Sequence, residues 1–494
     1  MRQSGILMHI TSLPGNYGIG TMGKEAYKFV DFLREAGQSY WQILPLSPTG
    51  FGDSPYQALS SCAGNHYLID LDTLVKEGLL KKAEIKAVSW GNNPRKVDFG
   101  ILYRYRTELL KLAFQRFTPD ERFSRFVEEN ESWLKDYALF MALKEHYDGS
   151  AWLDWPKQLR LRDEEALAEK REALAETVGF HYFLQYIFFR QWNALRAYAN
   201  GKGIRIIGDV PIYVPLDSVD VWAEPELYQL DESRHPIKVA GCPPDSFTAD
   251  GQLWGNPIYD WQKMADTNYA WWIRRFGAAA KLYDVIRIDH FRGFESYWAV
   301  PYGDKTARNG QWVKGPGMDF FRMVQREFPG LDFIAEDLGF VTPEVRQLQI
   351  DSGYPGMKVI EFAFDSREES DYLPHLYPVD SVCYTGTHDN VTLKQWLSEA
   401  SAKDVAYAKA YLGLNRGEGY VWGLIRGGMG SVSRLFIAQM QDYLELGKEA
   451  RMNFPGTVST DNWTWRAEKG FDSRRLAVKL YAMTKRYGRA PTGK

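Results

Sequence analysis

The chain is 494 residues long, more than one small hydrophobic core requires, which favours a large domain with insertions or several domains. Hydrophobic residues make up 45% of it and charged residues 25%, as in ordinary globular proteins. With 60 basic and 63 acidic residues the formal net charge is −3, and no long block of one sign occurs, which argues against nucleic acid or an anionic membrane as a partner.

Cysteine usage and the first residues indicate the cellular setting. Cys62, Cys242 and Cys383 lie far apart, so neither a disulfide framework nor a C-x-x-C metal pair is available. The start, M-R-Q-S-G-I-L-M-H-I, lacks the apolar segment and cleavage site of a signal peptide. No apolar run approaches the ~18 residues that a membrane span needs. We therefore expect a reducing, cytoplasmic setting.

The first part of the chain has the pattern of a β-α-β unit. An apolar stripe at helical spacing lies between two short apolar runs, and Gly37 follows the stripe as a helix stop. Strands joined in this way pair in parallel. The expected elements are a strand at 5–10, a helix at 24–36 and a strand at 40–46.

Residues 73–177 have a different pattern, with helices and no strands. Clear helical patterns occur at 99–117 and 131–147, and a charged run covers 160–176. We expect a mainly helical insertion carried by a loop, with a separate domain as the alternative. The main domain would then comprise 1–72 and 178–494, with further loop insertions at about 210–260 and 390–450.

The alternation of strands and helices resumes after an apolar helix at 180–199. Six further strands are expected at 204–210, 284–289, 332–337, 357–362, 381–385 and about 451–455. The helices expected between or after them are 261–282, 318–328, 343–351, 392–412, 431–446 and 473–487. Eight strands mostly separated by helices predict an α/β protein built on a closed (β/α)8 TIM barrel with helical and loop insertions. A doubly wound sheet is the alternative, which is disfavoured because neither the G-x-G-x-x-G nor the G-x-x-x-x-G-K-[ST] motif is in place.

Carboxylates follow the apolar runs of four expected strands. In a barrel of this kind the active groups lie at the C-terminal ends of strands. Buried unpaired carboxylates are costly, so four acids at equivalent strand ends indicate one shared polar pocket rather than four unrelated ion pairs. These acids are Asp209, Asp289, Glu336 and Asp389.

Two chemistries use acids clustered in this way. Divalent metal sites usually add several histidines or a tight D-x-D loop, and only eight histidines occur in the chain, so no metal is expected. Glycoside chemistry instead pairs a carboxylate nucleophile with a protonated carboxyl group. Arg287 beside Asp289 would keep that carboxylate ionised, and the apolar F-I-A before Glu336 would favour a retained proton there.

Several motifs carry a family resemblance. V-I-R-I-D-H-F-R-G-F (285–294), F-I-A-E-D-L-G (333–339) and Y-T-G-T-H-D-N (384–390) resemble signature regions of the α-amylase clan. In this wording they are most similar to the amylomaltases, the 4-α-glucanotransferases of glycoside hydrolase family 77. G-D-V-P-I-Y-V matches that family's strand-three region, whereas an ordinary amylase carries an Asn-His pair where Tyr213 and Val214 stand. The likeness covers essentially the whole chain and includes S-P-Y-Q (54–57), the segment 243–257, M-N-F-P-G and N-W-T-W-R.

The resemblance implies a role for each matching residue. Asp289 would be the nucleophile of a retaining double displacement, Glu336 the acid and then the base, and Asp389 the group that holds sugar hydroxyls and stabilises the oxocarbenium-like state. The implied substrate-binding residues are Ser54, Tyr56, Asp209, Trp254, Arg287, His388 and Asn462. The sequence leaves open whether Asn453 or Asn462 faces the substrate. Asp337, His290 and Arg292 are expected to be structural.

The expected function is a 4-α-glucanotransferase that moves an α-1,4-glucan segment to the 4-hydroxyl of an acceptor glucan or glucose through a covalent glycosyl-aspartate. Its substrates would be maltooligosaccharides and starch or glycogen chains, and no metal or organic cofactor is implied. The Gly/Pro-rich segment around Trp254 is the expected lid over the acceptor site. The alternatives are an α-1,4-glucan hydrolase of the same clan and a non-catalytic glucan-binding protein.

Overall fold

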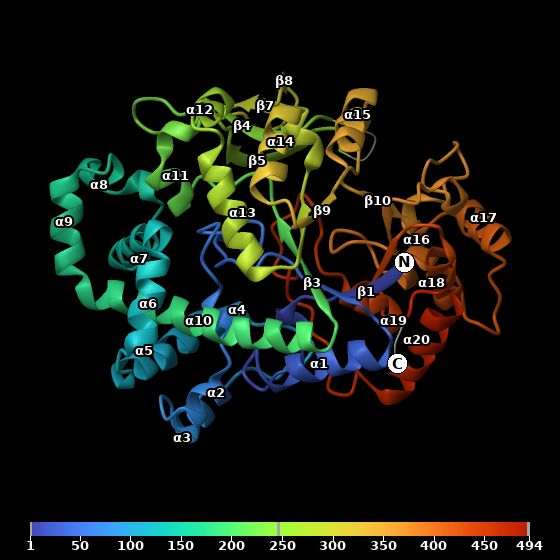
Figure 1. Cartoon of the computed structure of the whole chain (residues 1–494), viewed down its shortest axis with the longest axis horizontal. Coiled ribbons are helices and arrows are strands. Elements are labelled where there is room, and N and C mark those ends of the chain that lie inside the picture. The colour runs from blue at the N-terminus through green and yellow to red at the C-terminus, as the bar shows by residue number, and fades with distance from the viewer. Residues whose placement is uncertain (1, 245–247, 492–494) are drawn as a thin grey trace.

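The computed structural model describes residues 2–244 and 248–491. Its centre is a closed barrel of parallel strands in the order β1-β12-β11-β10-β9-β6-β3-β2 (Figure 1). The eight strands are β1 Gln3–Leu7, β2 Tyr40–Gln42, β3 Arg205–Val210, β6 Val285–Ile288, β9 Asp332–Ala335, β10 Gly356–Val359, β11 Ser381–Tyr384 and β12 Leu435–Gln439. The predicted (β/α)8 barrel is confirmed, as are seven of its eight strands.

The eighth strand prediction is wrong. Residues 451–454 form neither helix nor strand, whereas the run Leu435–Gln439, which the sequence assigned to a helix over 431–446, is β12. This strand pairs in parallel with both β1 and β11 and is buried along its whole length. A short apolar run that is buried on both faces has no periodicity to separate strand from helix, and the short helix α19 (Met440–Tyr443) follows it directly.

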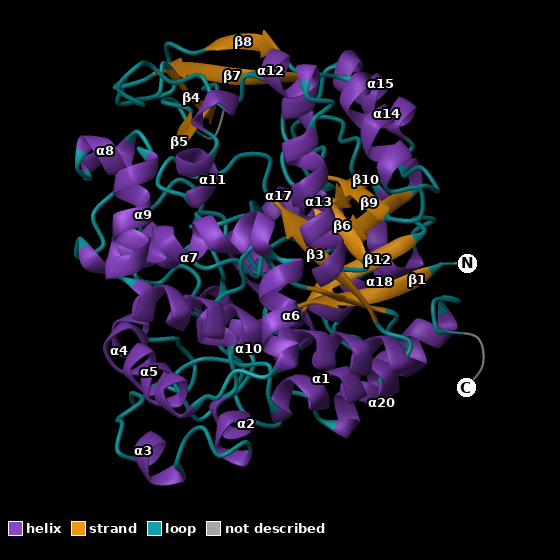
Figure 2. Cartoon of the chain, turned by 60° about the vertical axis from the view of Figure 1, so that its left-hand side comes forward, coloured by secondary structure: helices purple, strands orange, loops and turns teal. Residues whose placement is uncertain are grey.

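A second sheet, which the sequence did not predict, lies beside the barrel (Figure 2). It is antiparallel, in the order β5-β4-β7-β8, with β4 Lys238–Cys242, β5 Gln252–Pro257, β7 Ser296–Pro301 and β8 Gln311–Lys314. Two strands come from the segment after β3 and two from the segment after β6. The expected lid around Trp254 is therefore partly a strand, β5, and residues 245–247 of that segment lie outside the described residues.

Helices surround the barrel and build the insertion. Those between or after the barrel strands are α1 Lys24–Glu35, α10 Ala175–Gly201, α11 Val219–Ala223, α12 Trp261–Asp266, α13 Ala270–Leu282, α14 Met318–Glu327, α15 Pro343–Ser352, α16 Leu393–Glu399, α17 Ala402–Leu412, α18 Tyr420–Gly430 and α20 Arg474–Arg486. Those of the segment before α10 are α2 Leu71–Lys76, α3 Lys82–Lys86, α4 Phe99–Ile101, α5 Thr107–Arg116, α6 Glu121–Glu129, α7 Glu131–His146, α8 Lys157–Arg160 and α9 Glu164–Ala173. No named strand falls in 73–177, which the structure describes throughout. Its status as a subdomain stays a prediction.

Helix α10 fastens the long connection after β2 to the barrel. Gln185 accepts a hydrogen bond from the Gly64 backbone N–H (2.7 Å) and donates one to the Gly64 carbonyl (2.9 Å). Gln191 makes the same pair of bonds with the backbone of Asp70, at 2.7 and 3.2 Å. Both glutamines are buried, so these bonds satisfy amide groups that burial would otherwise penalise. The connection that carries Tyr56 is thereby tied to a rigid helix.

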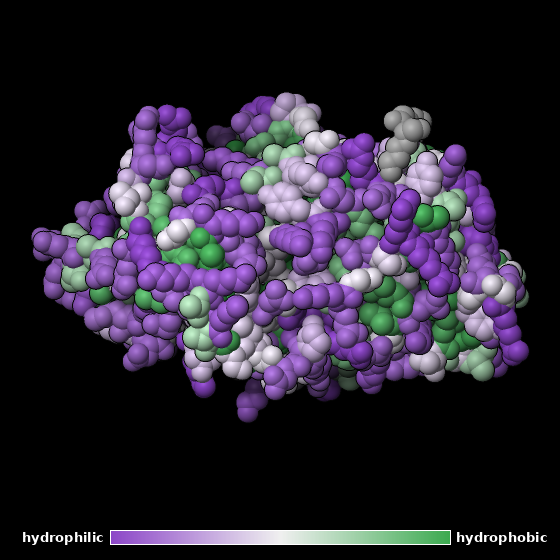
Figure 3. Space-filling model, turned by 90° about the horizontal axis from the view of Figure 1, so that it is seen from below, coloured by the Kyte–Doolittle hydropathy of each residue, from purple (hydrophilic) through white to green (hydrophobic). Residues whose placement is uncertain are grey.

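The face shown in Figure 3 is mostly hydrophilic, and its hydrophobic residues form small separate groups. Within 2–244 and 248–491, no helix is both long enough and apolar enough to span a bilayer. The cytoplasmic setting stays a prediction.

A substitution at Gly208 tests how tightly β3 packs. A Cβ built at this position would lie 2.1–2.2 Å from the ring of Tyr283, a buried residue whose hydroxyl accepts a hydrogen bond from the Leu46 N–H. We expect Gly208→Ala to destabilise the protein by about 1–3 kcal/mol through overpacking, seen as a lower urea midpoint. Gly201→Ala, where a Cβ meets nothing within 4 Å, is the control and should leave the midpoint unchanged or slightly raised. Equal midpoints for the two variants would contradict this account of β3.

Candidate active site

The strand register of the barrel brings Asp209 and Arg287 together. They are direct partners on β3 and β6, so their side chains leave the same face of the sheet. Arg287 Nη1 donates to both carboxylate oxygens of Asp209, at 2.8 and 2.6 Å, and also to Oδ1 of Asp289, at 2.8 Å. The side chains of Arg287 and Asp209 are only 4% and 1% exposed, whereas that of Asp289 is 28% exposed. Asp289 is thus the member of this cluster that faces the opening.

Arg287 supplies a fixed positive charge at this point. Burial alone would lower its pKa, but the carboxylates of Asp209 and Asp289 raise it well above the ordinary arginine value. Its Nε–H donates a 3.4 Å hydrogen bond to the sulfur of Met357, so a second nitrogen of the guanidinium is also bonded. The guanidinium therefore stays charged although it is buried, and its hydrogen bonds to Asp209 and Asp289 fix its orientation.

Glu336 follows β9 directly and occupies a different environment. Its Oε2 accepts a hydrogen bond from the His290 backbone N–H (2.7 Å), and its Oε1 accepts one from the Leu338 N–H (2.9 Å). Burial raises the pKa of Glu336 to about 7; Arg287 and the two N–H donors oppose the shift and Asp289 adds to it. Near neutral pH the group is therefore able both to give and to accept a proton, as the sequence prediction requires.

The loop after β11 carries His388 and Asp389. Asp389 Oδ2 lies 3.4 Å from His388 Nε2, and its Oδ1 accepts a 2.6 Å hydrogen bond from the Asn453 amide. Burial would raise the pKa of Asp389, but His388 and Asn453 lower it to about 2. For His388 burial acts in the opposite direction and lowers the pKa, because the charged form is the protonated one. The carboxylate of Asp389 more than offsets this effect, so the pKa of His388 rises above 6.5. The Asp389 side chain remains 45% exposed, so it is a charged group with access to a ligand.

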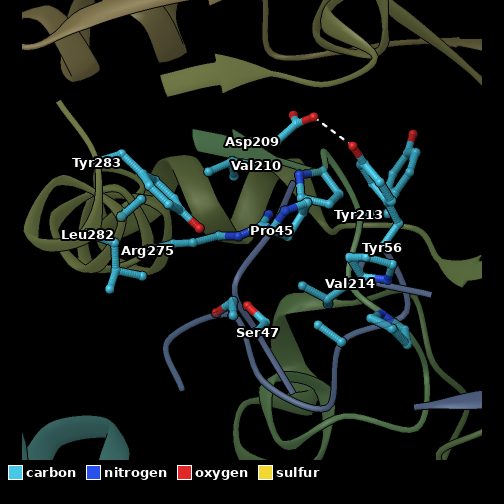
Figure 4. Close-up of a pocket in the computed structure, with 16 residues that line it drawn as sticks. Pro45, Ser47, Tyr56, Asp209, Val210, Tyr213, Val214, Arg275, Leu282 and Tyr283 are labelled. Atoms are coloured by element: carbon cyan, nitrogen blue, oxygen red, sulfur yellow. Dashed lines mark hydrogen bonds between the residues drawn. The ribbon is translucent and has the colours of Figure 1, made fainter. Parts of the chain in front are cut away.

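Three rings line the site beside these acids. The ring of Tyr56 stacks on that of His388 (centroids 4.8 Å apart, planes at 17°), and Trp463 lies 5.8 Å from both. The Tyr56 hydroxyl donates to Oδ2 of Asp209 at 2.7 Å, which Figure 4 marks. Trp463 is not among the predicted site residues, although it belongs to the N-W-T-W-R motif of the family resemblance. The stack joins the connections after β2, β11 and β12.

A small cavity lies between the end of β3 and helix α13 (Figure 4). Tyr56, Asp209, Arg275 and Tyr283 are among its lining residues, and its volume is about 30 Å³. That volume holds a water-sized molecule and not a sugar. Asp289 and Asp389, whose side chains are 28% and 45% exposed, are not among the residues that line this cavity.

The other predicted binding residues lie at different points around the acids. Trp254 on β5 packs its ring edge-on against His290, with centroids 4.8 Å apart. Ser54 accepts a hydrogen bond from the Tyr56 N–H (3.2 Å), so it shapes the turn that presents Tyr56. The Asn462 amide accepts from Phe454 N–H and donates to the Thr457 carbonyl, so it closes its own loop.

Of the two candidate asparagines, the structure brings Asn453 and not Asn462 into contact with Asp389. The assignment of Asn462 to substrate binding stays a prediction, and its amide is bonded within its own loop. Sequence spacing gave no signal, because neither asparagine belongs to a strand and the path of the loop 453–463 decides which one points inwards.

Two of the residues expected to be structural bond to the backbone of neighbouring segments. Arg292 donates to the Phe340 carbonyl (2.7 Å) and packs over the ring of Trp312. Asp337 accepts a hydrogen bond from the Met357 N–H (2.7 Å) and so links β9 to β10. The structural role expected of His290 stays a prediction; its backbone N–H donates to Glu336. Within the described part of the chain, no group of three or more His, Cys, Asp or Glu side chains is arranged to hold a metal ion.

The charge state of His388 provides a test of this electrostatic pairing. Because Asp389 offsets the effect of burial, Asp389→Asn should let the pKa of His388 fall below 6.5. The change is measurable by NMR titration of the imidazole protons, with His388→Gln used to assign the signal. Histidines remote from the site should titrate as before in the variant. An unchanged titration of His388 would show that the carboxylate does not control its protonation.

Comparisons with known proteins agree with this arrangement. A family model described as 4-alpha-glucanotransferase matches residues 8–471. The chain is 48% identical over 486 residues to the 4-alpha-glucanotransferase of Clostridium butyricum (98% of this chain, 100% of that protein), and 48% identical over 495 residues to that of Thermus thermophilus (98% of each). The amylomaltase from Streptococcus agalactiae, solved in complex with acarbose, matches with a TM-score of 0.97 at 43% identity, covering 99% of this chain and 100% of that one. The chain therefore belongs to the 4-alpha-glucanotransferase family, the amylomaltases.

Proposed function

We propose that the protein transfers α-1,4-glucan segments by a retaining double displacement in which Asp289 forms a covalent glycosyl ester. The observation that carries this mechanism is the contrast between two neighbouring carboxyl groups. Asp289 is bonded to the permanently charged Arg287, whereas Glu336 is buried with a pKa of about 7. A charged nucleophile and a proton donor are the two partners that glycoside cleavage requires.

In the first step, protonated Glu336 gives its proton to the glycosidic oxygen of the donor glucan. A carboxylate oxygen of Asp289 forms a bond to the anomeric carbon as the bond from that carbon to the leaving oxygen breaks, and the released chain leaves with a free 4-hydroxyl. Asp389, whose pKa His388 and Asn453 lower, would bind sugar hydroxyls and stabilise positive charge on the sugar ring.

In the second step, ionised Glu336 takes the proton from the 4-hydroxyl of an acceptor glucan. The acceptor oxygen attacks the anomeric carbon, the ester bond to Asp289 breaks, and the α-configuration is restored by the second inversion. A pKa near 7 suits a group that acts first as an acid and then as a base, because at neutral pH both its protonated and its ionised form are well populated.

The substrates that we propose are maltooligosaccharides and the α-1,4 chains of starch or glycogen. The names of the relatives and the acarbose held by the Streptococcus agalactiae enzyme support this class. Transfer prevails over hydrolysis where the acceptor position binds sugar and excludes water. Trp254 on β5, which packs against the residue next to Asp289, is the group that we propose for bordering that position.

Incubation with pure maltotriose tests the activity and its alternatives. A transferase yields glucose together with chains longer than maltotriose, a hydrolase yields only shorter sugars, and a binding protein changes nothing.

In the same assay Asp289→Asn should lose roughly 10³-fold or more of the rate, because it removes the attacking group. A 5-fluoro-glycosyl fluoride should label the wild type on Asp289, as located by mass spectrometry of peptides. An active Asp289→Asn variant or a label elsewhere would overturn the mechanism.

The two asparagines are expected to differ in their effect on catalysis. Asn453→Ala removes the 2.6 Å bond to Asp389 and should lower kcat/KM on maltotriose by roughly 10-fold, the equivalent of one hydrogen bond to a charged group. Asn462→Ala removes bonds within its own loop and should act mainly on thermal stability. Melting temperatures and kinetics measured on both variants decide between them. A larger kcat/KM loss in Asn462→Ala at unchanged stability would contradict the assignment.

A further inference from the structure

His290, the residue after Asp289, has a left-handed backbone, with φ 52° and ψ 49°. This conformation is sterically unfavourable for a residue with a Cβ atom, and residues other than glycine adopt it uncommonly. Strain of this kind persists where the surrounding structure imposes it, and it is frequent at functional sites. His290 lies between the proposed nucleophile, Asp289, and the buried residue Phe291.

The left-handed residue allows two successive N–H groups to reach Glu336. The His290 N–H donates to Oε2 of the Glu336 carboxyl group (2.7 Å), and the Phe291 N–H donates to the Glu336 backbone carbonyl (3.0 Å). In a continued strand, successive N–H groups point towards opposite edges and would not reach one residue. Consecutive N–H groups converge only when the backbone turns, as in the anion-binding concavities called nests.

The preceding and following contacts fix this turn in place. The Asp289 N–H donates to the Val210 carbonyl and the Glu336 N–H to the Ile288 carbonyl, both at 3.0 Å. The Gly293 N–H then closes the turn by donating to the His290 carbonyl (3.0 Å). Strands β3, β6 and β9 therefore continue their ladder up to the point where the two acids stand.

The His290 side chain points to a different neighbour. Its ring packs edge-on against Trp254, and burial lowers its pKa to about 4, so it is neutral in the working pH range. Asp289 opposes that shift and Arg292 adds to it. The group that His290 offers to Glu336 is thus the backbone N–H, and the imidazole seats the residue against β5.

We propose that His290 is a positioning residue whose left-handed backbone holds the carboxyl group of Glu336 towards the glycosidic oxygen. This role rests on the proposed function, because it requires Glu336 to act as the acid and then as the base. The Leu338 N–H holds the other carboxyl oxygen, so the removal of the His290 contact leaves Glu336 with one donor and one free torsion. The carboxyl group then loses both its orientation and a contact that favours its charged form.

Two substitutions that both delete the imidazole separate the backbone from the side chain. Asparagine adopts the left-handed conformation readily, whereas β-branched valine resists it. On maltotriose we expect His290→Val to lose about 10- to 100-fold more of kcat than His290→Asn. The alkaline limb of the pH–rate profile should move to higher pH in His290→Val alone, because a carboxylate that loses an N–H donor holds its proton more strongly. Circular dichroism and thermal melts report whether both variants fold, and His290→Ala replaces the valine variant if it does not.

An activated donor provides the second readout. Fluoride leaves with little help from an acid, so α-maltosyl fluoride bypasses the protonation by Glu336 in the first step. In the first turnover, before Glu336 has to act as a base, His290→Val should therefore release fluoride at nearly the rate of His290→Asn, although it is slow on maltotriose. A merely structural defect would slow both donors equally.

The outcomes distinguish a failure of the positioning role of His290 from a failure of the proposed acid–base role of Glu336. If His290→Val and His290→Asn share the same kcat and the same alkaline limb, the positioning role is wrong while the transferase activity stands. If Glu336→Gln keeps full activity on maltotriose, the proposed function fails first, and the role of His290 fails with it. If Glu336→Gln is rescued only with the fluoride donor and His290→Val resembles it, both are supported.

Discussion

The site depends on one buried guanidinium that is shared by two carboxylates. Arg287 is bonded to Asp209 and Asp289 through the same nitrogen, and its position follows from the pairing of β3 with β6. Removal of the arginine would leave Asp209 as an uncompensated buried charge, an effect of about 3–5 kcal/mol in comparable cases. Because Asp209 also holds the Tyr56 hydroxyl, the same ion pair orders the aromatic stack. The ion pair between Arg287 and Asp209 therefore contributes both to the stability of the barrel and to the geometry of the site.

Two acids at equivalent strand ends acquire opposite proton affinities from their neighbours. Glu336 and Asp389 are both subject to burial, which favours the neutral form. Asp389 has His388 and the Asn453 amide as neighbours that lower its pKa, whereas for Glu336 the charge of Arg287 and two peptide N–H groups only partly offset burial and the nearby charge of Asp289. Similar side chains thus acquire a raised pKa in one case and a lowered pKa in the other, because their surroundings differ.

Much of the fold and the acids of the site could be predicted from the sequence, because both depend on local patterns. Apolar runs marked seven barrel strands, and the acids that follow four of them converge because the barrel closes. What failed depended on distant contacts: β12 is a uniformly buried run without periodicity, and the small sheet forms only when two separate segments meet. The contact of Asn453, the ring of Trp463 and the backbone of His290 follow from loop paths that no motif spacing encodes.

The small sheet has a consequence for how members of this family can be recombined. Its inner strands, β4 and β7, pair with each other although they belong to different barrel connections, after β3 and after β6. A chimaera that exchanged only one connection would leave unpaired strand edges and a mismatched register in place of a sheet. The two segments are thus structurally coupled: an exchange of this sheet between relatives has to replace both connections together, the one before β6 and the one after it.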